Sequence, residues 1–298
     1  MHWTADDIGD LSARTAIVTG ATSGTGRVIA TELARHGATV LLAVRNTEAG
    51  RRVAAQMTGR TQVEQLDLAS LDSVRRFTER VAGPIDLLVN NAGVMQPQQY
   101  RTTTDGHELQ FGTNHLGHFA LTAGLLPALL AAPTPRVTTV SSIAHRQGSA
   151  AVLDANPAAG YQPGRTYGNS KLANLLFALE LQRRATAAQS PLTSTAAHPG
   201  VAVTNLVANP EGMGSRWFFR TVMPQLMRLV LPGAEGGAQP ILYAALVAEP
   251  GSYCGPSGPG EVRGGVGPAR MSTQAADRDL ARRLWTLSEE LTGVRFAF

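Results

Sequence analysis

The sequence has one cysteine and one lysine in 298 residues, and only 5% of its residues are aromatic. The single cysteine, Cys254, cannot form a disulfide within the chain, and no closely spaced Cys and His residues resemble a zinc site. Residues 1–10 lack the basic start and the apolar run of a signal peptide. We therefore expect a cytoplasmic protein without a metal site.

Long hydrophobic runs and an excess of one charge are missing as well. The longest apolar candidate, residues 217–231, is interrupted by Arg220, Pro224, Gln225 and Arg228, so it is too short and too polar to span a bilayer. The 26 basic residues are scattered among 22 acidic ones, with a net charge of +4 and no long basic run. This distribution argues against nucleic acid as a partner.

The sequence does contain a repeated unit between residues 14 and 200: a short apolar run, a turn and a helical pattern. This alternation predicts a parallel sheet with helices on both faces, whose strands are buried on both sides. The expected strands are residues 16–19, 39–44, 61–66, 86–90, 136–141 and 192–198, and the clearest helices are 24–36, 71–81, 234–247 and about 274–291. We therefore expect an α/β protein: a single-domain, Rossmann-type doubly wound sheet over residues 1–298.

The first expected strand runs into a glycine-rich turn, TGATSGTG. Glycines there permit positive φ and let the backbone approach a pyrophosphate, whose charge the following helix N-terminus stabilises. An ordinary tight turn is the alternative, but the flanking strand and helix favour a dinucleotide site. The predicted contacts in this turn are Gly20, Thr22, Ser23, Gly24, Thr25 and Gly26.

The second expected strand is followed by Arg45, where an NAD-binding unit usually carries an acidic residue. A guanidinium cannot accept hydrogen bonds from ribose hydroxyls, but it pairs with a 2′-phosphate. We therefore predict NADP(H) over NAD(H). A solvated charge at a strand end is the alternative interpretation, and Arg14, Arg27 and Arg51 are further candidates near the phosphates.

Tyr167 and Lys171 lie four residues apart in a helical stretch, so the phenol and the ammonium share a helix face. A cation beside the phenol favours the phenolate, and we expect it to lower the phenol pKa from about 10 by ~2–3 units, which suits a general acid/base. A surface cation beside a half-buried ring is the alternative. Lys171 is, however, the only lysine among 26 basic residues, and a guanidinium cannot replace its compact, adjustable ammonium.

Five segments, in this order, resemble the short-chain dehydrogenase/reductase family: TGATSGTG, Asn90-Asn91-Ala92-Gly93, Ser141-Ser142, YGNSK and His198-Pro199-Gly200. The strings DGHELQFGTNHLGHFALT and VSSIAH are similar, more narrowly, to the retinol-dehydrogenase-like branch. The resemblance extends from about residue 14 to the final helix. It implies a Rossmann-type fold and a nicotinamide cofactor.

The resemblance also implies roles for matched positions. Tyr167 corresponds to the catalytic acid/base, and Lys171 to its partner that also binds the nicotinamide ribose. Ser142 corresponds to the residue that hydrogen-bonds the substrate oxygen, and Asn114 to the one that holds a water for proton relay. Capping a strand and satisfying helix backbone are the simpler alternatives for these two. The implied cofactor contacts are Asp67, Leu68, Asn91, Ala92 and Gly93 on the adenosine half and Pro199, Gly200, Val201 and Thr204 near the nicotinamide.

Two departures from the family pattern have expected consequences. Thr25 stands where the family usually has an apolar residue, so packing or cofactor affinity is expected to differ. Residues 148–165 lengthen the distance between Ser142 and Tyr167 and are expected to add a wall to the substrate site.

His115 and His118 have a spacing that metals can use, but they lack an acidic or Cys companion, so we interpret them as packing histidines. The apolar segment 213–232, within a predicted lid of about 201–232, is expected to close over an apolar substrate. Contact with a membrane surface is the alternative, because the segment carries Arg216, Arg220 and Arg228.

Together these features predict an NADP(H)-dependent oxidoreductase that interconverts a carbonyl and an alcohol on a mainly apolar small molecule. A dinucleotide-binding redox sensor or scaffold without turnover is the alternative, and a nucleotide-sugar epimerase or dehydratase is a third hypothesis. After Tyr167, an apolar stripe builds either the core or a subunit interface. Because the corresponding helix often pairs with its copy in the family, a homodimer or homotetramer is a candidate assembly. The stripe consists of Leu172, Leu175, Leu176 and Leu179.

Overall fold

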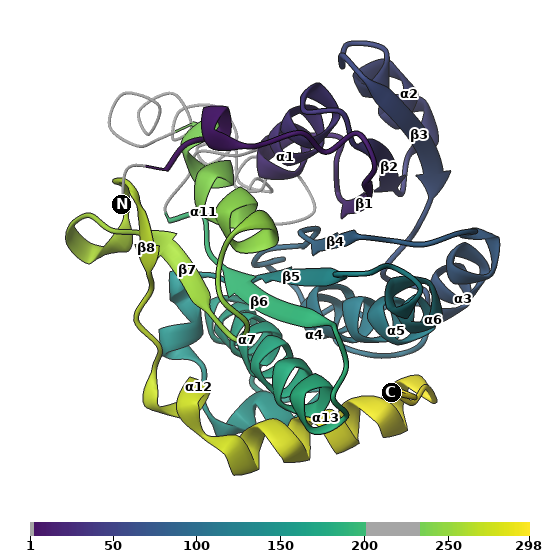
Figure 1. Cartoon of the computed structure of the whole chain (residues 1–298). Coiled ribbons are helices and arrows are strands. Elements are labelled where there is room, and N and C mark those ends of the chain that lie inside the picture. The colour runs from purple at the N-terminus through teal and green to yellow at the C-terminus, as the bar shows by residue number, and fades with distance from the viewer. Residues whose placement is uncertain (1–2, 201–232) are drawn as a thin grey trace.

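The computed structural model of the chain describes residues 3–200 and 233–298. Its strands form one eight-stranded sheet in the order β3-β2-β1-β4-β5-β6-β7-β8 (Figure 1). The strands are β1 (Thr15–Thr19), β2 (Thr39–Val44), β3 (Arg60–Gln65), β4 (Leu87–Asn90), β5 (Arg136–Val140), β6 (Thr193–Ala197), β7 (Tyr253–Pro256) and β8 (Val266–Pro268). The predicted Rossmann-type, doubly wound fold is confirmed. The predicted lid, with Val201 and Thr204, lies outside the described residues.

The parallel sheet predicted from residues 14–200 is confirmed, and the sheet continues with two further strands, β7 and β8. All neighbouring pairs from β3 to β7 are parallel, whereas β8 pairs antiparallel with β7. The connection over residues 257–265 is too short for the crossover that a parallel pair needs. Sequence patterns missed both strands, because they are short and contain Gly and Pro, which are depleted in strands.

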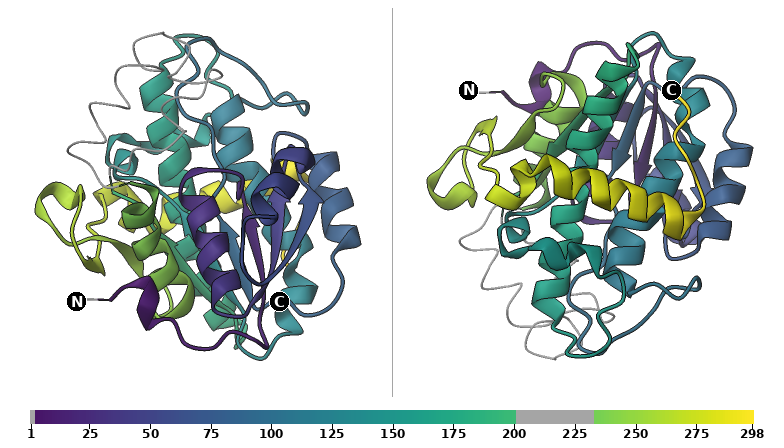
Figure 2. Two further views of the ribbon diagram at one scale, coloured as in Figure 1. Left: turned by 90° about the horizontal axis from the view of Figure 1, so that it is seen from above. Right: turned by 90° about the horizontal axis from the view of Figure 1, so that it is seen from below.

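Helices cover both faces of the sheet: α1, α2 and α11 on one, and α3, α5 and α7 on the other (Figures 1 and 2). The α-helices are α1 (Gly24–Arg35), α2 (Thr47–Ala54), α3 (Leu71–Arg80), α4 (Leu109–Phe111), α5 (Gly117–Gly124), α6 (Leu126–Leu130), α7 (Pro163–Ala187), α11 (Ala234–Leu246), α12 (Thr273–Ala276) and α13 (Arg278–Thr292). The short helices are η1 (Ala5–Asp7), the π-helix η2 (Gly112–Leu116), η3 (Ile143–Gln147), η4 (Ala150–Leu153) and η6 (Pro259–Glu261).

Adjacent residues of β1 serve opposite faces of the sheet. Val18 packs in the cluster that includes Ile29 of α1 and Ile241 of α11, whereas Ile17 packs with Phe119 of α5. This alternation follows from strand geometry, and it explains why the strand is apolar at successive positions.

The predicted final helix is divided in two. Asp277 separates α12 from α13, and its Oδ1 accepts the backbone N–H groups of Asp279 and Leu280. As predicted, the helix ends at Gly293, whose φ of +70° is left-handed. In the view from below, α13 runs across α7 (Figure 2).

Helix α13 forms a third layer, which covers the leucine stripe of α7. Leu172, Leu175 and Leu176 are fully buried in a cluster that includes Leu280 and Leu284 of α13. The stripe therefore builds core, and a subunit contact through it would require α13 to move.

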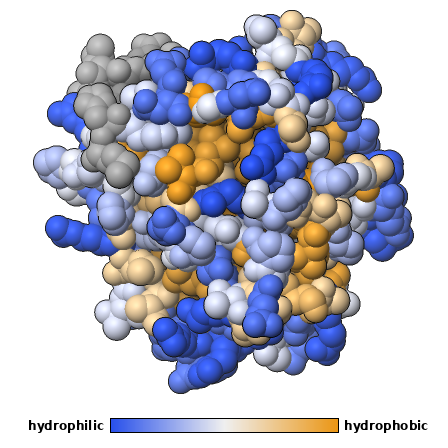
Figure 3. Space-filling model, viewed as in Figure 1, coloured by the Kyte–Doolittle hydropathy of each residue, from blue (hydrophilic) through white to orange (hydrophobic). Residues whose placement is uncertain are grey.

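No helix within residues 3–200 and 233–298 is both long enough and apolar enough to cross a bilayer. On the face shown in Figure 3, apolar residues gather in the upper middle, where Figure 1 places α11, and polar residues surround them.

Candidate active site

The candidate residues follow the carboxyl ends of the parallel strands, so the topology collects them at one edge of the sheet. This edge includes the switch point between β1 and β4, where chain connections run in opposite directions and where open α/β sheets bind their ligands. The segments are the glycine turn after β1, Arg45 after β2, Asp67 and Leu68 after β3, Asn91 to Gly93 after β4, Ser141 and Ser142 after β5, and His198 to Gly200 after β6.

The glycine turn has the close backbone packing expected of a phosphate cradle. Gly20 has a φ of +68°, and a Cβ there would lie 2.9 Å from the Cα of Ala92. A Cβ at Gly26 would lie 2.5 Å from the Gly20 carbonyl oxygen. Ser23 precedes the twelve-residue helix α1, and its side chain accepts no capping hydrogen bond from the first backbone N–H groups. The turn and the helix N-terminus therefore fit a dinucleotide pyrophosphate.

Thr25 has a role that its departure from the family pattern left open. Its Oγ1 donates a hydrogen bond to Asn91 Oδ1 at 3.0 Å, and Asn91 Nδ2 donates to the Thr19 carbonyl oxygen at 2.9 Å. Thr25 thus ties the glycine turn to the segment after β4.

Among the arginine candidates, the structure separates Arg14 from the others. Arg14 precedes β1, at the opposite end of that strand from the glycine turn, and pairs with Asp86 at 3.1 Å. Arg45 is exposed and lies at the carboxyl end of β2. Arg27 donates to Gln56 Oε1 at 3.0 Å, and Arg51 is exposed on α2.

Next along this edge, Asp67 is partly buried, and its Oδ1 accepts the Ala69 backbone N–H at 3.0 Å. Leu68 is buried, and its carbonyl oxygen would lie 2.4 Å from a Cβ at Gly117. The segment after β3 therefore packs tightly against α5.

Tyr167 and Lys171 are both almost fully buried in α7, with 6% and 3% of their surface exposed. Lys171 Nζ lies 5.9 Å from the centre of the Tyr167 ring and donates to the Val140 carbonyl oxygen at 3.1 Å. The Ser142 hydroxyl lies close enough to the Tyr167 phenol to lower the phenol pKa. The structure thus brings Tyr167, Lys171 and Ser142 close together, and their catalytic roles stay predictions.

The predicted lowering of the Tyr167 pKa is wrong for this arrangement. Burial raises the pKa of the phenol to about 12, against a smaller lowering by the nearby Ser142 hydroxyl. Burial also lowers the pKa of Lys171 to about 8. Spacing along a helix could not reveal these shifts, because removal from water disfavours both the phenolate and the ammonium.

Asn114 connects α7 to the loop after β4. Its Nδ2 donates to Ser170 Oγ at 2.9 Å and to the Val94 carbonyl oxygen at 3.0 Å, and its Oδ1 accepts the Val94 N–H at 2.8 Å. A Cβ at Gly93 would lie 3.1 Å from Asn114 Oδ1 and 3.6 Å from Lys171 Nζ. The catalytic candidates therefore adjoin the loop that also packs on the glycine turn.

The residue that sequence analysis undervalued here is His118. Its Nδ1 donates to the Asn114 carbonyl oxygen at 2.9 Å, so its neutral Nε2, 2.9 Å from Thr19 Oγ1, accepts from that hydroxyl. Burial lowers the pKa of His118 to about 4, which keeps the imidazole neutral. The sequence contains the motif around His118, but only the structure shows that His118 connects Thr19 of β1 to Asn114 of the π-helix. His115 instead packs among aromatic rings and contacts Ser288 Oγ at 2.8 Å.

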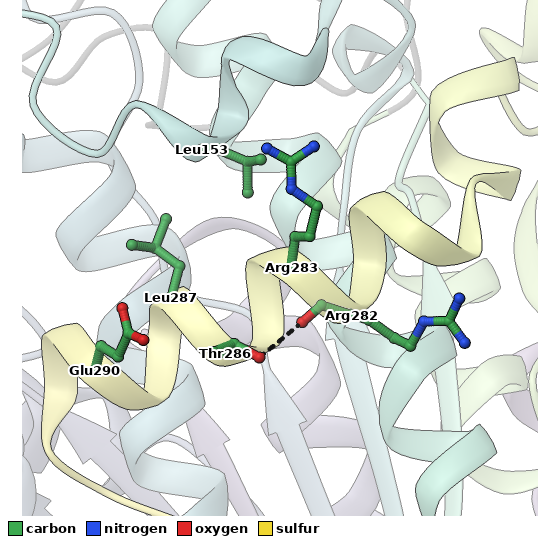
Figure 4. A pocket seen from close by; sticks show the side chains of 6 residues that line it. All are labelled: Leu153, Arg282, Arg283, Thr286, Leu287 and Glu290. Atoms are coloured by element: carbon green, nitrogen blue, oxygen red, sulfur yellow. Dashed lines mark hydrogen bonds between the residues drawn. The ribbon is translucent and has the colours of Figure 1, made fainter.

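Two further features of the described residues lie outside this chemistry. No three His, Cys, Asp or Glu side chains in residues 3–200 and 233–298 gather in a way that could hold a metal ion. A surface hollow of about 420 Å³ contains none of the candidate site residues. Figure 4 shows the side chains that line it. These side chains are Leu153, Arg282, Arg283, Thr286, Leu287 and Glu290.

Comparison with known proteins places the chain among the short-chain dehydrogenases. The sequence model of the short chain dehydrogenase family matches residues 14–212. Retinol dehydrogenase 13 of Homo sapiens is 38% identical over 293 residues, which cover 95% of this chain and 86% of that protein. Polyprenol dehydrogenase of Mus musculus is 40% identical over 296 residues, which cover 94% and 84%.

Solved structures give the same result. A crystal structure of an uncharacterized protein from Mycobacterium paratuberculosis superposes with a TM-score of 0.85 and 45% identity over the whole of both chains. A short-chain dehydrogenase from Shigella flexneri 2a str. 301, complexed with NADP, has a TM-score of 0.61 and 26% identity and covers 80% of this chain and 93% of its own. From its sequence, its sheet order and these likenesses, the chain belongs to the short-chain dehydrogenase/reductase family.

Proposed function

We propose that the protein is an NADP(H)-dependent oxidoreductase that interconverts a carbonyl and an alcohol on a mainly apolar small molecule. The observation that carries the proposal is the pair of buried residues Tyr167 and Lys171 on one helix, with the Lys171 ammonium 5.9 Å from the phenol ring and beside the loop that packs on the glycine turn. The names of two relatives, a retinol dehydrogenase and a polyprenol dehydrogenase, support an apolar alcohol or carbonyl as substrate.

The polar side chains supply proton management and orientation. When bound, the dinucleotide supplies or accepts the hydride. In the reductive direction, Ser142 and Tyr167 donate hydrogen bonds to the carbonyl oxygen, where negative charge develops. With a pKa of about 12 the phenol of Tyr167 holds its proton, which it transfers as that charge forms. Below about pH 8 the Lys171 ammonium stabilises the phenolate that remains.

The cofactor contacts divide along the dinucleotide. The glycine turn and the α1 N-terminus would hold the pyrophosphate, and Arg45 would pair with the 2′-phosphate at the carboxyl end of β2. Asp67, Leu68, Asn91, Ala92 and Gly93 would surround the adenosine half, whereas Pro199 and Gly200, with Val201 and Thr204, would lie near the nicotinamide. The solved complex of a related short-chain dehydrogenase with NADP supports the preference for NADP(H) over NAD(H). The cytoplasmic location, the single domain and a homodimer or homotetramer stay predictions.

The experiment that tests the proposal compares oxidation of NADPH and NADH with a set of apolar aldehydes and ketones that includes retinal. We expect turnover with preference for NADPH, and a fall of ~10²–10⁴-fold in kcat for Tyr167→Phe with NADPH still bound. Tight NADPH binding without turnover of any carbonyl would favour the redox sensor or scaffold instead. Full activity of Tyr167→Phe would remove the assignment of the acid/base, and a preference for NADH would overturn the role of Arg45.

A further inference from the structure

The connection between β7 and β8 carries a buried carboxylate, Glu261, with 8% of its surface exposed. Its Oε2 accepts a hydrogen bond from Arg146 Nη2 at 2.5 Å, and its Oε1 accepts the backbone N–H of Arg270 at 2.9 Å. His198 Nε2 lies 3.2 Å from Oε2, although the contact lacks hydrogen-bond alignment. One carboxylate therefore contacts three segments that are far apart in the sequence.

The backbone of Glu261 is itself in an unusual conformation. Its φ of +58° lies in the left-handed region, which residues with a side chain rarely adopt. Such a conformation persists only where surrounding contacts hold it. The contacts of the carboxylate and the hydrogen bond from its N–H to the Gly258 carbonyl oxygen at 2.9 Å provide that hold.

The first segment held by Glu261 is the turn that presents Ser142. Arg146 lies in η3, and Ser142 caps this helix by accepting the Ala144 N–H at 3.2 Å. In the same helix, His145 Nδ1 donates to the Ser142 carbonyl oxygen at 2.7 Å, while its Nε2 accepts the Ser272 N–H at 3.2 Å. The Ser142 turn is thus held from the C-terminal part of the chain.

The second segment is the turn after β6. His198 Nδ1 accepts the Gly200 N–H at 3.1 Å, so a neutral His198 carries its proton on Nε2, beside Glu261. Gly200 has a φ of +71°, and a Cβ there would lie 2.4 Å from the Val262 carbonyl oxygen. This turn therefore packs directly on the backbone that follows Glu261.

We propose that Glu261 is a positioning residue: it holds the Ser142 turn and the Pro199–Gly200 turn at a fixed separation. The inference rests on the proposed function, in which Ser142 contacts the substrate oxygen and the second turn lies near the nicotinamide. Loosening this connection alters the alignment of the reacting groups while the glycine turn stays intact. Misplacement by about 1 Å can cost ~10²-fold in rate, so kcat is affected more than NADPH affinity.

The test compares Glu261→Gln and Glu261→Asp with Glu180→Gln. Glu180 is a matched control, because it is also a buried carboxylate and accepts from Arg183 at 2.8 Å and from Arg184 at 3.0 Å. It lies thirteen residues beyond Tyr167, about 20 Å along the same helix. We expect Glu261→Gln to lower kcat by ~10-fold or more with a less than ~3-fold change in the NADPH Kd. Glu261→Asp should recover part of kcat, and Glu180→Gln should keep it.

Hydrogen exchange measured by mass spectrometry tests the connection without turnover. Glu261→Gln should speed amide exchange in peptides covering residues 142–147 and 196–200, whereas Glu180→Gln should not. If the wild-type protein reduces no carbonyl, the proposed function fails, and this exchange difference still decides the positioning role. A folded Glu261→Gln variant with wild-type exchange and wild-type kcat would overturn the inference, as would an equal loss of kcat in Glu180→Gln.

Discussion

The glycine turn after β1 and the Ser142 turn after β5 lie at the same edge of the sheet, but different contacts hold them in place. The glycine turn is shaped by backbone packing and by Asn91, which follows the adjacent strand β4. The Ser142 turn depends on Glu261 and Ser272, more than a hundred residues later in the chain. The glycine turn is therefore held by the segments that follow two adjacent strands, whereas the Ser142 turn is held by groups from the C-terminal part of the chain.

The largest expected effect concerns Lys171, which lies beside the loop that packs on the glycine turn. Lys171→Met removes the ammonium beside Tyr167, and we expect kcat for carbonyl reduction to fall by ~10²–10⁴-fold. Because the Lys171 pKa is about 8, the ammonium is present below that pH and is lost above it. Wild-type activity should therefore decline as the pH rises through 8, and the variant should lack this step. A pH profile of kcat/KM checks both, and equal profiles would show that Lys171 is not the titrating group.

The next effect tests how much the C-terminal helix contributes to the stability of the fold around α7. Trp285 of α13 is buried and stacks on Phe177 of α7 with ring centres 5.8 Å apart. Trp285→Ala should lower the free energy of unfolding by ~3–5 kcal/mol, because it leaves a cavity beneath the catalytic helix. Urea denaturation measures the loss.

Trp3→Ala is the control, since Trp3 is only partly buried and contacts Tyr243 at the opposite face. Its loss of stability should be smaller. Equal losses for the two variants would show that the packing of α13 contributes no more to the free energy of unfolding than the Trp3 contact does.

A third change strains the glycine turn. Gly26→Ala places a Cβ against the Gly20 carbonyl oxygen and should cost ~1–3 kcal/mol of overpacking. The NADPH Kd should rise, whereas the kcat of protein saturated with NADPH should change less. Gly9→Ala, where a Cβ meets nothing within 4 Å, should leave the Kd unchanged. Titration of NADPH fluorescence gives the Kd values, and an unaltered Kd in Gly26→Ala would contradict the cradle.

The smallest effect sharpens the role of Thr25. Thr25→Val preserves the shape of the side chain and removes its hydrogen bond to Asn91, which should cost about 1 kcal/mol of stability. Thr31→Val, which removes a hydrogen bond within α1, is the matched control. If the Tm and the NADPH Kd change equally in both variants, the hydrogen bond between Thr25 and Asn91 contributes no more to stability or to cofactor binding than one within α1.

Local patterns predicted the elements whose signals lie within a few residues. The apolar runs predicted β1 to β6, and the spacing of Tyr167 and Lys171 placed both side chains on one face of α7. The leucine stripe on that helix could not be assigned, because helical periodicity is the same for a core and for an interface. Nothing in the sequence around Glu261 indicated a functional residue, because Arg146 and His198, two of its partners, lie far from it in the sequence.

The sequence alone determined the order of strands and helices up to β6, the glycine turn and the set of polar residues at the carboxyl ends of the strands, since each depends on local periodicity and backbone preference. Only the tertiary structure decided that α13 covers α7, that β8 reverses direction, and that burial raises the Tyr167 pKa and lowers the Lys171 pKa. The reason is physical: desolvation and side-chain contact depend on neighbours in space, which can come from any part of the chain.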